Sequence, residues 1–197
     1  MLISLKNNLC ILAMPKTGTT AIEAALAPYC DMVFTKDPRV KHMPLPRFTR
    51  FIAPYLREIG QSGIETTCLI RHPEAWLGSW YRYRARPALN GHENSTAGIE
   101  FEDFVAAYLA ETKPAFARVG RPARFVGADQ GRPGVTHLFK YENFPDWQRF
   151  LEARFGTSLD VPRKNVSPAR DLSLSAPMRR ALETRLAEDY ALYENAG

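Results

Sequence analysis

An almost wholly apolar run near the start of the chain ends in a short polar loop, and this feature constrains the fold most. Residues 9–14 read LCILAM, Pro15 follows, and residues 16–20 read KTGTT. An alanine-rich, helix-like segment begins directly afterwards. An apolar strand of this kind is covered on both faces, which is usual in parallel sheets. The unit of strand, small-residue loop and helix therefore indicates an α/β architecture.

Short apolar runs alternate with longer amphipathic ones along the rest of the chain. The strands expected from these runs cover residues 8–14, 32–35, 66–70, 124–126 and 137–141. The expected helices cover residues 19–27, 45–59, 73–84, 101–109, 145–155 and 176–193. Pro73 suits a first helical position, and Ser175 can cap the last helix. The alternation predicts an α/β fold in which helices flank both faces of a mainly parallel central sheet. Residues 86–98 and 113–134 are expected to be loops, and their functions stay open.

The composition suits one globular domain spanning residues 1–197. A net charge of +5 favours an anionic small ligand and is too small to predict nucleic-acid binding. Two of the three cysteines, Cys10 and Cys68, lie in apolar runs and are expected to be buried thiols. Because no signal-peptide pattern is visible and no run reaches the roughly 20 apolar residues of a membrane helix, we expect a cytoplasmic protein without a membrane span.

The loop KTGTT is a candidate anion site, since the first N–H groups of a helix have no internal partner and the helix dipole favours negative charge. Lys16 would add a charge, Gly18 a close backbone approach, and Thr17, Thr19 and Thr20 hydroxyl groups. The loop differs from the nucleoside-triphosphate motif G-x-x-x-x-G-K-[ST], because Lys16 precedes the only glycine. A simple capped turn is the alternative reading of this segment.

The sequence PKTGTT resembles the 5′-phosphosulfate loop of sulfotransferases that use 3′-phosphoadenosine 5′-phosphosulfate (PAPS), where the loop typically reads P-K-[ST]-G-[ST]-[ST]. The resemblance is to the carbohydrate-type and bacterial branch. It implies a three-layer P-loop-like fold and PAPS as co-substrate, with 3′-phosphoadenosine 5′-phosphate (PAP) as product. A sulfuryl group carries less charge than a terminal phosphoryl group, so its transfer is expected to proceed without a metal.

The family also holds the nucleotide 3′-phosphate with an Arg at a strand end and a Ser eight residues further on. Residues 66–84, TTCLIRHPEAWLGSWYRYR, place Arg71 and Ser79 at that spacing. An Arg can bind two phosphate oxygens at once. His72 stands where the family usually has another residue. A surface ion pair for Arg71 and an ordinary helix serine for Ser79 are the alternatives.

The resemblance continues in the C-terminal third. Residues 139–156 resemble the family's strand, turn and helix, in which Glu142 would fix the turn. Residues 162–170, PRKNVSPAR, resemble a loop that closes on the nucleotide. The resemblance implies phosphate contacts for Arg163 and Lys164, and loop-fixing roles for Asn165 and Ser167.

In sulfuryl transfer an acceptor oxygen attacks in line with the bond to the leaving phosphate. We assign Lys16 to the leaving oxygen and His42 to the acceptor as the candidate general base, because a His pKa lies near neutral pH. Glu23 and Asp37 are the fallback bases. Arg82, Arg84 and Arg86 either line an acceptor groove or form a solvated helix face.

The expected function is therefore sulfuryl transfer from PAPS to a hydroxyl group of a carbohydrate or small metabolite. A P-loop nucleotide kinase or NTPase and a non-catalytic PAP-binding module are the alternatives. The sequence does not name the acceptor. It also leaves the oligomeric state open, with a homodimer as one option.

Overall fold

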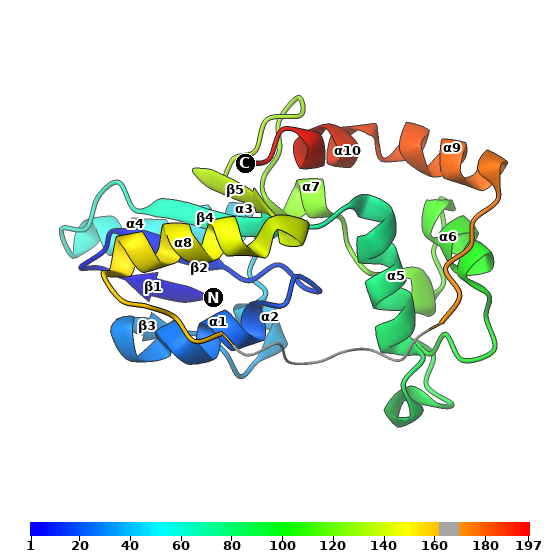
Figure 1. The fold of residues 1–197 in the computed structure, drawn as a ribbon, viewed down its shortest axis with the longest axis horizontal. Helices are drawn as coiled ribbons and strands as arrows, with labels where there is room; N and C mark the ends of the chain where they lie inside the picture. Colours follow the sequence, from blue (N-terminus) through cyan, green and yellow to red (C-terminus); the bar gives the residue numbers. More distant parts are fainter. Residues whose placement is uncertain (162–169) are drawn as a thin grey trace.

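The structure is a computed structural model that describes residues 1–161 and 170–197 (Figure 1). Its strands are β1 (Leu2–Ser4), β2 (Leu9–Leu12), β3 (Met32–Val33), β4 (Glu65–Ile70) and β5 (His137–Lys140). Its α-helices are α1 (Thr19–Leu26), α2 (Pro38–Lys41), α3 (Leu45–Arg47), α4 (Ala53–Glu58), α5 (Pro73–Arg84), α6 (Phe101–Leu109), α7 (Pro122–Phe125), α8 (Phe144–Phe155), α9 (Ala176–Arg185) and α10 (Ala187–Glu194). A π-helical turn, η2 (Phe48–Ile52), joins α3 to α4. Short 3₁₀ turns are η1 (Ala27–Tyr29), η3 (Pro87–Leu89), η4 (Ala115–Ala117) and η5 (Tyr141–Asn143).

The five strands form one mixed sheet in the order β3-β1-β2-β4-β5. The three strands β2, β4 and β5 run parallel, with Leu12 opposite Cys68 and Cys68 opposite Leu138. Strand β1 is antiparallel to both of its neighbours. The α/β prediction is thus confirmed. The carboxyl ends of β2, β4 and β5 meet at one edge of the sheet, which we call the carboxyl edge, and their starts define the amino edge.

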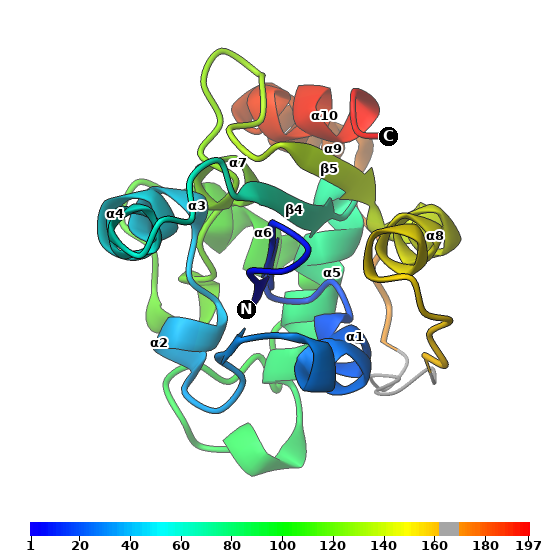
Figure 2. The same cartoon turned by 90° about the vertical axis from the view of Figure 1, so that its left-hand side faces the viewer.

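Alternate side chains of β2 enter two different cores, because successive residues of a strand point to opposite faces. Leu9 and Ile11 pack with residues of α1 and α8, whereas Cys10 and Leu12 pack with residues of α4, α7 and α10. Figure 2 shows α8 and α4 on opposite sides of the sheet. Each fully buried Leu or Ile side chain contributes about 1.5–3 kcal/mol relative to exposure. Cys10 and Cys68 are buried free thiols, as predicted.

A third core lies beyond the carboxyl edge, among α5, α6 and α9 (Figure 1). Trp76 and Tyr81 of α5 pack there with Phe104 of α6 and Leu182 of α9. The bounds of α5 and α6 agree with the predicted ranges, and Ser175 caps α9 by accepting a hydrogen bond from the Met178 N–H group. This helical layer contacts the loop of residues 15–18, because Trp76 of α5 bonds to Pro15.

Several predicted elements are wrong. Residues 124–126 are not a strand: Pro122 begins the short helix α7, whose start is satisfied when the Ala123 N–H group donates to Asp189. The predicted helix over residues 45–59 is interrupted by η2, because Pro54 has no N–H group for the preceding turn.

The predicted helix over residues 176–193 breaks at the buried Leu186, whose backbone leaves helical geometry. Strand β1 and helix α2 were not predicted. Both are short, and β1 is recognisable only through its pairing with β2 and β3.

Candidate functional site

The loop that joins β2 to α1 has an unusual backbone. Lys16 and Gly18 both have positive φ, 71° and 69°, while Thr17 between them does not. Alternation of this kind turns successive N–H groups toward one concave side and is known from anion-binding nests. The buried Thr17 hydroxyl donates to the Met14 carbonyl oxygen at 2.8 Å, which ties the loop to the end of β2. The sequence predicted a close approach at Gly18, but the left-handed Lys16 was not foreseen.

Arg71 follows β4 and reaches across to this loop. Its Nη1 donates to the Lys16 carbonyl oxygen at 3.3 Å, and its guanidinium carbon lies 4.6 Å from the centre of the Tyr141 ring. The Nε atom is buried and has no hydrogen-bond partner among the described residues. Burial lowers the pKa of Arg71, against the raising effects of Tyr141 and Glu142. A buried guanidinium with an unused donor is costly, and an anion beside it would offset that cost.

The Lys16 amine lies over the ring of Tyr83, 4.0 Å from its centre. Burial and, to a smaller extent, the positive charges of Arg86, Arg71 and Arg82 together lower its pKa to about 8. Arg86 also lies on the Tyr83 ring, at 3.6 Å from the centre. Four cationic side chains therefore face one region at the carboxyl edge. A focus of positive charge next to a concave backbone is suited to an anion.

Three aromatic residues position this site, and sequence reasoning had given none of them a site role. Trp76 donates its indole N–H to the Pro15 carbonyl oxygen at 2.9 Å. Tyr141 lies beside Gly18, where an added Cβ would come within 3.2 Å of its ring. Tyr83 supports Lys16. Only the crowding of aromatic residues in α5 hinted at such roles, and that crowding also fits a simple core.

His42 caps the end of α2 and contacts the chain just before the loop. Its Nδ1 lies 2.7 Å from the Ala13 carbonyl oxygen. Because a carbonyl oxygen only accepts, Nδ1 must donate there, and the neutral ring keeps its lone pair on Nε2. Burial lowers the pKa of His42, which keeps the ring neutral near pH 7. The fold thus brings His42 to the end of β2, beside Ala13.

The two fallback bases are engaged elsewhere. Glu23 is 2% exposed and pairs with the Met1 amine at 3.0 Å and with the Lys41 amine at 2.8 Å. Asp37 caps α2 by accepting from the Arg39 backbone N–H group, and hydrogen bonds from the Arg39 side chain and backbone lower the pKa of Asp37 to about 2. Glu23 therefore fixes α1 against α2, and Asp37 is too weak a base for the role.

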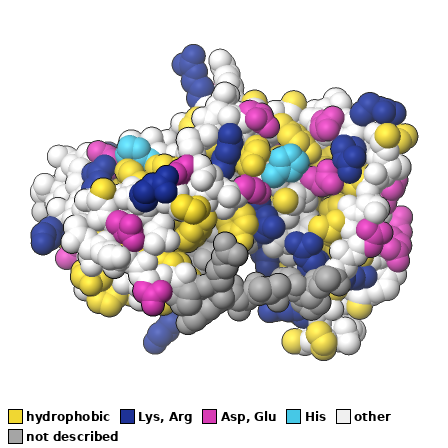
Figure 3. Space-filling model, in the orientation of Figure 1, with side chains coloured by type: hydrophobic (Ala, Val, Ile, Leu, Met, Phe, Trp, Pro, Cys, Tyr) yellow, Lys and Arg dark blue, Asp and Glu magenta, His cyan; other side chains and the backbone are white. Residues whose placement is uncertain are grey.

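The remaining predicted site residues are dispersed. Ser79 is buried in α5, Thr19 is buried at the start of α1, and Thr20 is exposed and accepts a hydrogen bond from Lys41. Glu142 accepts from the His72 N–H group, which fixes the turn that carries Arg71. Arg163, Lys164, Asn165 and Ser167 lie outside the described residues. On the face drawn in Figure 3, Lys and Arg side chains are spread over the surface among Asp and Glu side chains.

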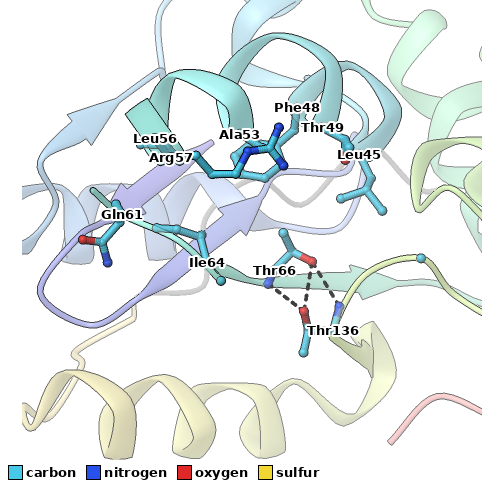
Figure 4. Close-up of a pocket in the computed structure, with 12 residues that line it drawn as sticks. Leu45, Phe48, Thr49, Ala53, Leu56, Arg57, Gln61, Ile64, Thr66 and Thr136 are labelled. Carbon is cyan, nitrogen blue, oxygen red and sulfur yellow. Dashed lines mark hydrogen bonds between the residues drawn. The ribbon is translucent and has the colours of Figure 1, made fainter. Parts of the chain in front are cut away.

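A cavity of about 280 Å³ lies at the amino edge, between α4 and the start of β4 (Figure 4). Thr66 and Thr136 point toward one another there, and each N–H group donates to the other's hydroxyl oxygen at 3.0 Å. These two threonines thereby satisfy one another's polar groups. Ligands of open α/β sheets bind outside the carboxyl ends of the strands, which favours the Lys16 region over this cavity.

Among the described residues, no cluster of three or more His, Cys, Asp or Glu side chains is placed to hold a metal ion. No helix in the described part of the chain is both long and apolar enough to cross a bilayer. Comparison of the chain with protein-family models, with curated proteins and with solved structures found no match.

Proposed function

We propose that this protein is a sulfotransferase that moves a sulfuryl group from PAPS to a hydroxyl group of a carbohydrate or small metabolite. The observation that carries the proposal is the contact between Arg71 and the Lys16 carbonyl oxygen, at 3.3 Å. Two segments that resemble the two phosphate motifs of one family, 55 residues apart in sequence, converge at the carboxyl edge. The proposed fold relationship is to the P-loop-like sulfotransferases.

The residues present fit a nucleotide with phosphate groups at both ends. The Arg71 guanidinium keeps an unused buried donor, and the loop of residues 15–18 has nest-like backbone geometry. Arg71 would hold the 3′-phosphate, together with Ser79. The loop N–H groups and the hydroxyl groups of Thr17, Thr19 and Thr20 would hold the 5′ end. PAPS supplies the activated sulfuryl group when bound.

Lys16 and His42 would divide the chemistry. Protonated Lys16 stabilises negative charge on the leaving oxygen. His42, held neutral with its Nε2 lone pair free, accepts the acceptor's proton. The Lys16 amine now rests on Tyr83, so it would leave that ring to reach the leaving oxygen.

Thermal unfolding in the presence of nucleotides tests the proposal. A ligand that binds only the folded state raises the melting temperature by mass action. We expect PAP to stabilise the protein and AMP, which lacks the 3′-phosphate, to stabilise it much less. Stabilisation by ATP with magnesium but not by PAP would favour a nucleotide kinase or NTPase. Stabilisation by PAP without transfer to any acceptor in a broad panel would favour a non-catalytic binding module.

A further inference from the structure

A second basic region lies outside the candidate site. A cavity of about 550 Å³ is bordered by the end of α6, the segment between η4 and α7, and the junction of α9 with α10. Its volume falls within the roughly 300–1,000 Å³ range of small-molecule sites. None of its lining residues belongs to the Lys16 loop or to α5. It is therefore a separate site from the one assigned to the nucleotide.

The lining of this cavity is strongly cationic. Glu111 is the acidic residue among the lining side chains, against five basic ones: Lys113, Arg118, Arg121, Arg124 and Arg185. Burial lowers the pKa of Lys113, and the charges of Arg185 and Arg121 lower it further. All three side chains line the same cavity. Like charges that converge on a hollow favour an anion within it.

The protein holds part of this lining in place. The Lys113 amine bonds to the Tyr108 carbonyl oxygen and lies 3.9 Å from the centre of the Tyr108 ring. The Nε of Arg118 donates to the Lys113 carbonyl oxygen at 2.8 Å, which leaves its terminal nitrogens for other partners.

Within residues 1–161 and 170–197, Arg121 is the one basic residue of the lining that pairs with a carboxylate. Its Nε pairs with Asp189 at 2.6 Å. The other four basic residues carry more positive charge than Glu111 carries negative charge. The cavity lining is therefore net positive even without Arg121.

We infer that this cavity binds a small polyanion bearing phosphate or sulfate ester groups. Guanidinium groups pair with the oxygens of such esters through two parallel hydrogen bonds. Several cations around one open cavity suit a ligand with more than one anionic group better than a single carboxylate. Phosphate and sulfate esters share this chemistry, and the experiment separates them.

Isothermal titration calorimetry with inositol hexakisphosphate and with inositol hexasulfate, which carry six ester groups on the same ring, tests the inference. Both probes are titrated into the full chain carrying Arg71→Ala, which weakens the candidate nucleotide site. The test variant adds Arg185→Glu. The matched control adds Arg180→Glu, which makes the same charge change on an exposed residue of α9 outside the cavity. A second variant, Arg118→Gln, keeps the test informative if Arg185→Glu unfolds, and circular dichroism checks the fold of each.

We expect Arg185→Glu and Arg118→Gln each to weaken probe binding by about tenfold, while Arg180→Glu changes it by less than about twofold. The probe that binds more tightly identifies phosphate or sulfate as the preferred group. The inference is overturned if neither probe binds at about 0.15 M ionic strength. It is also overturned if the cavity variants bind as the control does. Either result leaves the nucleotide proposal intact, because that site is tested with PAP on the unaltered chain.

Discussion

The polar side chains at the two edges of the sheet differ in how far they bond to one another. At the amino edge, Thr66 and Thr136 satisfy one another, and His137 donates to Glu65 at 2.7 Å. At the carboxyl edge, Arg71 keeps a buried donor without a partner among the described residues, and Lys16 is crowded by other cations. Polar groups that bond to one another stabilise the fold. Groups left unsatisfied at a cost are the ones that suit a ligand.

The largest effect is expected for Lys16→Ala, with Lys6→Ala as its control. Lys16 follows β2, and Lys6 is an exposed residue of the turn that precedes it. If Lys16 stabilises the leaving oxygen, its loss should lower turnover of PAPS by about 10²–10³-fold. Much of the PAP affinity should remain, since Arg71 and the loop backbone are unchanged. Transfer from labelled PAPS and calorimetry with PAP measure the two effects. Equal losses of turnover and affinity would contradict the assigned role.

A second pair compares the two histidines. His42→Ala should lower turnover by about 10²-fold, as expected for loss of a general base. His137→Ala, at the amino edge, should leave turnover unchanged and reduce stability slightly through loss of its bond to Glu65. Activity with unaltered His42 should also fall as the pH drops below the usual His range, because burial lowers its pKa. Normal turnover by His42→Ala would place the base elsewhere.

Arg71→Ala and Arg57→Ala form the third pair. Removing the guanidinium at the carboxyl edge should weaken PAP binding by about tenfold to 10²-fold, the scale of a charge-assisted, bidentate contact. Arg57 lines the amino-edge cavity and is exposed, so its removal should leave PAP affinity unchanged. Calorimetry with PAP measures both. A similar loss in the two variants would mean that overall charge, and not the site, binds the nucleotide.

The pH dependence of turnover distinguishes Lys16 at the carboxyl edge from exposed lysines. Exposed lysines lose their proton near pH 10.4, but the pKa of Lys16 is lowered to about 8. If protonated Lys16 is required, kcat/KM should fall by up to about tenfold per pH unit as the pH rises above 8. Lys16→Arg keeps its charge across this range and should remove the decline. A decline that persists in Lys16→Arg would have another origin.

The lowered pKa of Lys16 also predicts that folding stability changes with pH. The sign of the change follows from the protons bound at Lys16 in the folded and unfolded chains. Between pH 8 and about 10.4 the unfolded chain binds more protons at Lys16 than the folded chain does. The contribution of Lys16 to folding stability therefore rises across this window and is least favourable below it. Urea unfolding of Lys16→Met against the unaltered chain isolates this contribution.

The smallest expected effect comes from two glycines. Gly18 and Gly63 both have positive φ, 69° and 73°, so alanine at either position costs about 1 kcal/mol. At Gly18 a Cβ would also meet the Tyr141 ring at 3.2 Å, whereas at Gly63 it would meet nothing within 4 Å. Urea unfolding should therefore show a larger loss for Gly18→Ala, together with weaker PAP binding. Equal losses of stability would mean that the Tyr141 ring moves aside without a free-energy cost.

The parts of this protein that local sequence determined are those in which neighbouring residues decide the outcome. The apolar run of β2, the proline that begins α5 and the serine that caps α9 each act on a few neighbouring residues. Strand β2, helix α5 and the start of α9 are confirmed. The same locality explains the errors. The short apolar run at residues 124–126 suits a strand or a buried helix, and only packing against α10 decides between them.

Tertiary structure alone decided how the site is assembled. The loop was predicted as a strand–helix junction, but the Trp76 bond to Pro15 and the placing of Tyr141 against Gly18 join residues 61 and more positions apart. The lowered pKa of Lys16 arises from burial and from arginines elsewhere in the sequence. Electrostatic repulsion and desolvation depend on distances in space. The sequence could therefore identify the charged residues of the site, but it could not predict their pKa values.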